Sequence, residues 1–312
     1  MTLTLDRLPR PVAAVHDAVR HRAALALRDR VAGDDASGRA DQIWGAAGPR
    51  WFSPSDPIWR VHLDASMFVG GIRALLLQAL HPLAMAGVTD FSNYQSDPWG
   101  RLQSTSNFIS QTTFGTIEDS ERLLDRINSI HSHIQGTTPD GRHYSATDPH
   151  LLAWVHAAEI DAFLSCFEAY GSSRLTPEEA DTYVAQTGRA AARLGVVSPP
   201  QSVAELRSTI ASFEPELEIT PAAREVLRFI VWRPPMPLAA RPAYLSLVAG
   251  ALATLPPYAL ELFGVRLPPG GRRVMRLAGS GGAGAIRWML HDPMVRADRR
   301  MDGLPGDDRI QR

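Results

Sequence analysis

The segment DPHLLAWVHAAEIDAFLSCFEAY, residues 148–170, decides the fold class. Asp148 is a capping side chain placed directly before Pro149, and proline is favoured at the first position of a helix. Behind this start, apolar side chains recur at intervals of three and four residues, which is the spacing of one helix face. That face comprises Leu152, His156, Ile160, Phe163 and Phe167. The segment therefore predicts a long buried helix with a histidine on its inner face.

The same start signals recur along the chain. Further capping residues stand directly before proline at Asp97-Pro98, Thr176-Pro177 and Thr220-Pro221. The spacing of a capping box is present at Thr176 with Glu179 and at Ser202 with Glu205. Between these starts the period is helical, and convincing alternation of the β type is hard to find. We predict an all-α fold, a single multi-helix globular domain of about ten helices.

Composition changes at both ends of the chain. Residues 1–40 and the last residues are rich in Arg and Asp, whereas the middle is apolar and helix-like. We expect a peripheral N-terminal helix or arm over 1–40, the main helical domain over 41–295, and a flexible C-terminal tail over 296–312.

Every one of the 32 basic residues counted as Lys or Arg is Arg. The absence of lysine excludes Schiff-base enzymes, phosphate loops that end in Gly-Lys-Ser/Thr, and protein kinases. The formal net charge of −1 predicts no nucleic-acid partner. With Cys166 as the one cysteine, an intrachain disulfide and a cysteine-based metal site are excluded.

Two apolar stretches are long enough to be considered as membrane-spanning helices. The first, 67–88, is interrupted by Arg73, Gln78, His81 and Pro82, and the second, 244–264, by Pro256-Pro257. We interpret the second as a buried helix pair around the Pro-Pro break. The N-terminus has charges throughout and no apolar signal core. We expect a cytoplasmic protein with at most peripheral membrane contact.

Three histidines are predicted to face the interior. In the helix expected over 118–134, His131 shares a stripe with Leu124 and Ile127, whereas His133 lies on the wet face. His156 lies on the inner face of the helix that begins at Pro149. His81 closes an apolar helix, beside Gln78. Each is either a core residue with a polar partner or a ligand, since an unpaired buried imidazole costs about 1–3 kcal/mol.

An arginine is predicted to face the same interior. In the helix that begins at Pro98, Arg101 shares a face with Leu102 and Thr105, while Gln103, Ser106 and Ser110 point away. A buried guanidinium needs an anion. The partner is either a protein carboxylate, such as Glu159 or Asp161, or an anionic group of a cofactor or substrate.

Other motifs are weak. Residues 279–284 match the dinucleotide pattern G-x-G-x-x-G, but no strand precedes them, and we interpret them as a flexible glycine loop. Metal signatures of the H-E-x-x-H type and a G-x-S-x-G nucleophile elbow are absent.

In their order along the chain, several of these segments resemble one known family. The segments are 71–82 (GIRALLLQALHP), 97–102 (DPWGRL) with Thr105, 114–115 (FG), the helix bearing His131, 136–149 (GTTPDGRHYSATDP) and 154–157 (WVHA). This order is similar to the catalytic domain of rubber oxygenases, which include bacterial latex-clearing proteins and the fungal membrane-bound oxygenase of mycophenolic acid biosynthesis. The resemblance covers about residues 55–295.

The resemblance implies an all-helical fold around an internal pocket for non-covalent haem b. It implies an oxidoreductase that uses dioxygen, and in some cases an electron donor, on a hydrophobic small molecule. The axial iron ligand maps onto His131, and the distal Arg and Thr onto Arg101 and Thr105. His156, His81 and Gln78 are further candidates for the cofactor pocket. Latex-clearing proteins carry a Lys immediately before the Thr, where this chain has Ser104, so the distal cation of those relatives is missing.

Two rival functions remain open at this stage. One is a non-haem enzyme on the same scaffold, with a metal bound by His81, His131 and His156. The other is a haem or lipid carrier or sensor without turnover, which Ser104 in place of Lys favours.

Overall fold

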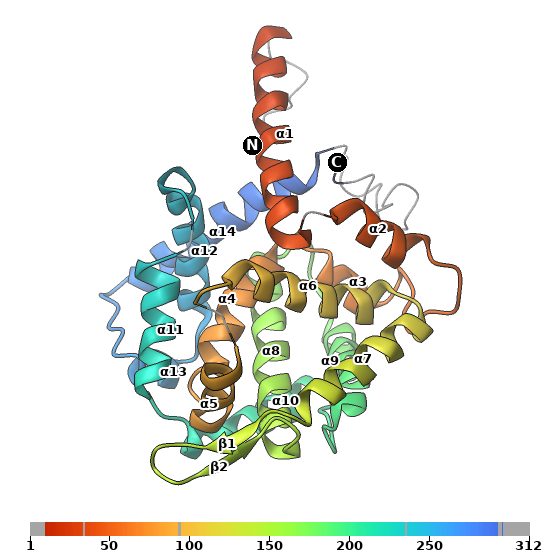
Figure 1. The fold of residues 1–312 in the computed structure, drawn as a ribbon. Helices are drawn as coiled ribbons and strands as arrows, with labels where there is room; N and C mark the ends of the chain where they lie inside the picture. The colour runs from red at the N-terminus through yellow and green to blue at the C-terminus, as the bar shows by residue number, and fades with distance from the viewer. Residues whose placement is uncertain (1–9, 34, 93–94, 235, 293–294, 296–312) are drawn as a thin grey trace.

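The structure is a computed structural model, and it describes residues 10–33, 35–92, 95–234, 236–292 and 295 (Figure 1). Helices dominate it. In chain order the elements are α1 (Arg10–Ala32), α2 (Ala36–Gly45), α3 (Pro57–His62), α4 (Ser66–Gln78), α5 (Pro82–Phe91), α6 (Pro98–Phe114), α7 (Ile117–His131), β1 (Gln135–Thr137), β2 (His143–Ser145), α8 (Pro149–Tyr170), α9 (Pro177–Leu194), α10 (Val203–Phe213), η2 (Glu214–Glu216), α11 (Pro221–Trp232), η3 (Leu238–Ala240), α12 (Arg241–Thr254), α13 (Pro257–Leu262) and α14 (Gly271–Leu290). The predicted all-α fold is confirmed.

The predicted helix starts are confirmed at each Asp-Pro and Thr-Pro pair. Asp97, Asp148, Thr176 and Thr220 cap α6, α8, α9 and α11, each with its side chain accepting a backbone N–H of the first turn. Thr176 and Glu179 form a complete capping box. The helix count, however, is fourteen within the part of the chain described, against the predicted ten or so. Short helices such as α3 and α13 account for much of the difference, because six residues show too little periodicity to be recognised.

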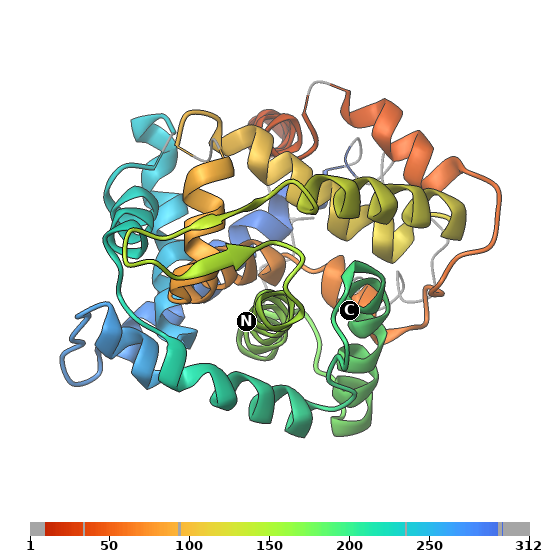
Figure 2. The same ribbon diagram turned by 60° about the horizontal axis from the view of Figure 1, so that its bottom comes forward.

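Helix α8 is the centre of the domain, and Figure 2 views it nearly end-on with other helices around it. Helix α4 packs along it, and α9, α10 and α14 also contact it. Its side chains Trp154, Phe163 and Phe167 belong to the main apolar core, together with Leu76, Leu77 and Leu80. The predicted inner face is confirmed, and α8 is in fact buried on more than one side.

Helices α12 and α14 pack together through glycine. A Cβ atom on Gly279 would lie 2.5 Å from the Cα of Gly250, so the two backbones touch. Gly282 lies equally tightly against Ser246 and Leu247 of α12. The expectation of a flexible glycine loop at 279–284 is therefore wrong: these residues form the middle of α14, and their small size permits the close helix crossing.

A two-stranded antiparallel hairpin follows α7, and the sequence pattern gave no sign of it. Strands β1 and β2 pair with Gly136 opposite Tyr144. The phenol of Tyr144 lies over Gly136, where any Cβ would collide with it, and its hydroxyl donates to Asp90 of α5. Three-residue strands are too short for alternation to be visible. The hairpin fastens the end of α7 to α5.

No single helix in the described ranges is long and apolar enough to cross a membrane. Helices α4 and α5 pass the test of length and composition only as a pair, and they are bent by 106° at the break that contains His81. The stretch 244–264 forms α12 and α13 around Pro256-Pro257, as predicted.

The expected N-terminal arm over 1–40 contains α1 and the first half of α2, which continues to Gly45. Figure 1 shows the first part of α1 standing away from the domain, while its last turns reach the other helices. Helix α1 packs against α6 and α14. The tail predicted over 296–312 lies outside the described residues, and the domain boundaries stay predictions.

Candidate functional site

The three residues mapped onto the distal side lie in the first half of α6. Arg101 is partly buried, and its Nη1 donates to Oγ of Ser92 at 2.8 Å. Ser104 and Thr105 are exposed, and each hydroxyl donates to the carbonyl one turn earlier in its own helix. Back-bonding of this kind satisfies a hydroxyl locally. The structure thus gives these two side chains no contact with the interior.

The predicted orientation of α6 is wrong in part. Gln103, Ser106 and Ser110, which were expected to point away, line a pocket against α1 and α2. Leu102, expected to face inward, is 37% exposed. The cause is the packing of α1 and α2 on the side of α6 that the sequence pattern marks as polar.

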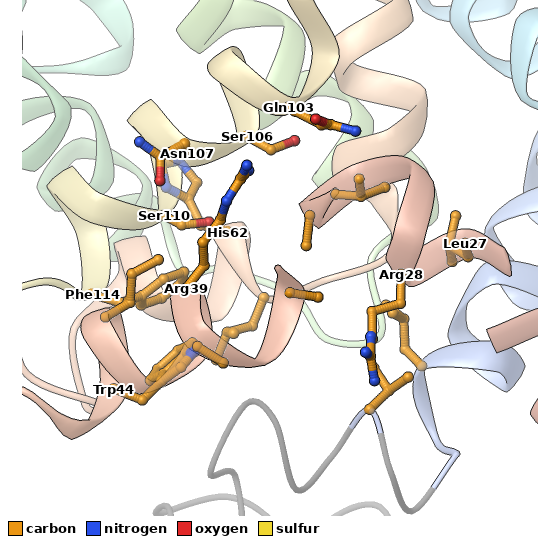
Figure 3. Close-up of a pocket in the computed structure, with 18 of the residues that line it drawn as sticks. Leu27, Arg28, Arg39, Trp44, His62, Gln103, Ser106, Asn107, Ser110 and Phe114 are labelled. Carbon is orange, nitrogen blue, oxygen red and sulfur yellow. The ribbon is translucent and has the colours of Figure 1, made fainter. Parts of the chain in front are cut away.

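That pocket has a cavity volume of about 170 Å³ and mixes apolar and amide walls (Figure 3). Its apolar side includes Leu27, Val31, Ile43, Trp44, Met289 and Leu290. Figure 3 shows Gln103, Ser106, Asn107 and Ser110 of α6 gathered on one side, with Leu27 and Arg28 of α1 opposite. Hydrophobic walls with a few convergent polar groups are typical of small-molecule sites.

His62 connects the pocket to the buried interior. Its Nδ1 lies 2.7 Å from Oγ1 of Thr113, and its Nε2 lies 3.2 Å from the hydroxyl of Tyr183. Burial lowers the pKa of His62 to about 3, so the imidazole is neutral at physiological pH. A neutral ring with two hydroxyl partners donates to one and accepts from the other.

Glu159 lies in the same interior. Burial raises the pKa of Glu159 to about 7, and the Glu159 charge contributes to raising the pKa of Tyr183. Within the described part of the chain its carboxylate has no hydrogen bond and no ion pair. A carboxyl with a pKa near neutrality can hold or release a proton at physiological pH, as acid–base groups in enzymes do.

His131 and His156 each present a buried nitrogen without a hydrogen-bond partner, as His81 also does. The Nε2 of His156 and the Nδ1 of His131 are both buried, and neither makes a hydrogen bond. Burial lowers the pKa of His156 to about 4 and also lowers the pKa of His131. His156 is buried as predicted, whereas His131, the last residue of α7, is only partly buried. Both rings are neutral, which is the form that binds metals.

Helices α6 and α7 diverge from the turn at Gly115 in Figure 1. Arg101 in the first turn of α6 and His131 at the end of α7 therefore lie at the far ends of the two helices. The hairpin β1–β2 then leads from His131 to α8, which carries His156 and Glu159 one turn apart. The predicted residues are spread around the α6–α7–α8 region rather than joined in one contact cluster.

Among the described residues, the arginine that is buried almost completely is Arg73 of α4. Its side chain is 3% exposed, with Nη2 2.7 Å from Oδ2 of Asp161 and Nε donating to the carbonyl of Thr254 at 3.1 Å. Asp161 was one protein carboxylate considered for Arg101, but it pairs with Arg73 instead. Glu159, the other, is left unpaired.

His81 and Gln78 lie at the break between α4 and α5. Gln78 donates its side-chain amide to the carbonyl of Val155 and so fastens α4 to α8. His81 is 1% exposed and caps α5, and burial lowers its pKa. It lies with His150 and Glu216, in the one group of three potential metal ligands found among the described residues. Neither His131 nor His156 belongs to such a group, so the metal triad of His81, His131 and His156 is not assembled.

Sequence reasoning passed over His62, Tyr183 and His150. His62 ends a helix of only six residues, so its inward face could not be recognised by periodicity. Tyr183 lies on the apolar face of α9, where the sequence gives no sign that its hydroxyl has a polar partner. His150 gave no signal beyond its place in the first turn of α8.

The family described as ER-bound oxygenase mpaB/B'/Rubber oxygenase, catalytic domain, matches residues 59–288. This range runs from α3 to α14 and contains every predicted site residue. No curated protein and no solved structure gives a significant match.

Proposed function

Because the chain belongs to the family of the mpaB and rubber oxygenase catalytic domains, we propose that it is a haem-b-dependent oxygenase for a hydrophobic small molecule. Membership of this family suggests that the site carries out oxygenase chemistry. The haem, the use of dioxygen and the hydrophobic substrate are the proposal.

The observation that carries the haem is the pair of unpartnered imidazole nitrogens. His131 Nδ1 and His156 Nε2 are buried without a hydrogen bond. Leaving such a nitrogen unsatisfied costs about 1–3 kcal/mol each. A neutral, buried imidazole in a helical domain is the type of side chain that ligates haem iron. These two free nitrogens are the observation that supports a bound haem.

His131 would hold the iron, as the resemblance implies, and Arg101 would bind an anionic group such as a propionate. When bound, haem iron supplies the capacity to activate dioxygen. His156 would contact the cofactor or its substrate through Nε2. We leave His81 and Gln78 outside the proposed haem site, because their contacts are to His150, Glu216 and the backbone of α8.

In this proposal, buried titratable side chains hold and exchange a proton, and apolar side chains exclude water from the pocket. Glu159 holds its proton near neutral pH and can exchange it, since burial raises its pKa to about 7. The Thr113–His62–Tyr183 chain keeps a neutral imidazole fixed between two hydroxyls. Apolar side chains on α1, α2 and α14 would accommodate a hydrophobic substrate in the pocket that reaches His62.

Absorption spectra of protein produced with an adequate haem supply test this function. We expect a Soret band in the wild type and in His133→Ala, whose histidine is exposed in the turn that follows α7. His131→Ala should abolish the band while circular dichroism still shows a folded protein. His156→Ala should retain haem but shift the band. Colourless wild-type protein that also fails to take up added haem contradicts the proposal.

A haem carrier without turnover is the second candidate. The observation that favours it is the exposure of Ser104 and Thr105, whose hydroxyls bond to their own helix. Measuring oxygen consumption in the presence of a reductant and a panel of apolar alkenes distinguishes an oxygenase from a haem carrier. A carrier would bind haem but consume no oxygen above the background of free haem.

A further inference from the structure

A second polar cluster lies outside the proposed haem site, where three distant segments meet. His81 comes from the α4–α5 break, His150 from the first turn of α8, and Glu216 from the 3-10 turn η2 after α10. One ligand atom from each residue lies within 4.8 Å of the other two. We propose that these three side chains bind a divalent transition-metal ion, namely zinc, with water in the fourth position.

The separations suit such an ion. Both carboxylate oxygens of Glu216 lie 2.9 Å from Nε2 of His150. Oε2 lies 3.4 Å from Nε2 of His81. Two ligands of a tetrahedral zinc, each about 2.0–2.1 Å from the ion, are about 3.3 Å apart. Small side-chain movements are therefore enough to place an ion between them.

The buried member of the cluster is incompletely satisfied. His81 is 1% exposed, and its Nε2 makes no hydrogen bond of good geometry although it faces the Glu216 carboxylate. Coordination through Nε2 would place the ring proton on Nδ1. The ring would then give up only the contact from the Ala84 amide, which at 3.5 Å is at the limit of a hydrogen bond.

The protein positions the three ligands without the ion. The backbone N–H of Glu218, two residues after Glu216, donates to the carbonyl oxygen of Leu80 at 2.9 Å. This hydrogen bond holds η2 against the α4–α5 break. The rings of Trp154 and Phe213 surround the imidazoles, with His150 and Phe213 centroids 4.5 Å apart. Nearby Arg142 is neutralised by Asp140 and Glu218.

One coordination position faces solvent. The side chains of His150 and Glu216 are 55% and 42% exposed, so water can reach an ion held between them. Two histidines, one glutamate and an open position form the donor set of zinc sites that retain a water molecule. The ion would fasten η2 to both α5 and α8.

Calorimetric titration of chelator-treated, dialysed full-length protein with zinc chloride tests the site. We expect one equivalent bound by the wild type, and binding at least tenfold weaker in His150→Ala and in Glu216→Gln. Both substituted side chains are exposed to about half of their surface, so these variants should fold. His133→Ala, an exposed histidine elsewhere, should bind as the wild type does.

Two further measurements separate this site from haem binding and from loose surface binding. His131→Ala should retain full zinc binding, which keeps the result independent of the proposed haem. Cobalt should give the visible bands of a tetrahedral ion in the wild type and in His131→Ala, but not in the His150→Ala/Glu216→Gln double variant. Equal zinc affinity in the wild type and in the His150→Ala/Glu216→Gln double variant would overturn the proposal.

Discussion

The Nε2 atom of His62 lies 3.2 Å from the hydroxyl oxygen of Tyr183, at a point where α3 and α9 meet. Tyr183 is fully buried, and His62 is held neutral with a pKa of about 3. A neutral imidazole needs a partner at each nitrogen, and Thr113 supplies the other. The pair therefore joins the pocket wall to the core of the domain.

Removing the phenolic hydroxyl should destabilise the protein. In Tyr183→Phe, Nε2 of His62 loses its partner while buried, and we expect the free energy of unfolding to fall by about 1–3 kcal/mol. Urea denaturation followed by circular dichroism measures the change. Tyr258→Phe is the matched control, because the Tyr258 hydroxyl is buried and already has no partner. Equal loss in both variants would contradict a specific role for the His62 contact.

Glu159→Gln should stabilise the protein in a pH-dependent manner. The pKa of Glu159 is about 7 in the folded state against an ordinary 4.5, so the folded state retains a proton that the unfolded chain releases in this range. Stability is therefore lost as the pH rises from about 4.5 to 7. The substitution removes this loss, and we expect a gain of about 1–3 kcal/mol at pH 8 and much less at pH 5.

The control for this effect lies on the same helix. Glu168 is exposed, and Glu168→Gln should change stability equally little at both pH values. Melting temperatures across pH 5–8 give the comparison. If the stabilisation by Glu159→Gln does not increase with pH, then folding does not raise the pKa of the Glu159 carboxyl.

Gly279→Ala should weaken the α12–α14 packing. Its Cβ would lie 2.5 Å from the Cα of Gly250 and 2.9 Å from the Tyr170 ring, so the helices must separate. We expect a loss of about 1–3 kcal/mol. Gly281→Ala, on the open side of the same helix, meets no atom within 4 Å and should stabilise by about 0.5–1 kcal/mol. Chemical denaturation of the two variants checks the opposite signs.

Arg73→Ala should be strongly destabilising, because it leaves the partly buried Asp161 carboxylate without its partner. We expect a loss of about 2–4 kcal/mol, of which Arg73→Met with Asp161→Leu recovers most. Arg122→Ala, which removes a 67% exposed arginine from its pair with Asp119, should have no measurable effect. If the double variant is as unstable as Arg73→Ala, the loss comes from packing rather than from the unpaired charge of Asp161.

The helical fold could be predicted because its signals are local. A capping side chain followed by proline specifies where a helix begins, and α6, α8, α9 and α11 begin as predicted. Glycines 279–284 were misinterpreted because a close helix crossing and a flexible loop require the same residue. Only the position of Gly250 on α12 distinguishes them.

The site was less predictable, because it depends on which helices meet. Periodicity placed His156 in the interior, and its position on α8 confirms this. It failed for α6, where α1 and α2 cover the polar face and leave Thr105 exposed. The partners of Arg73, His62 and His81 lie on other helices far along the chain, and one sequence has no pattern that reveals them.

The touching glycines also have a mechanical consequence. Because no side chain separates them, the backbones of α12 and α14 are in direct contact at Gly250 and Gly279, and this contact fixes the spacing of the two helices. Met289 and Leu290 at the far end of α14 form part of the pocket wall. The position of this part of the pocket wall therefore depends on a helix–helix contact whose glycines lie outside the pocket.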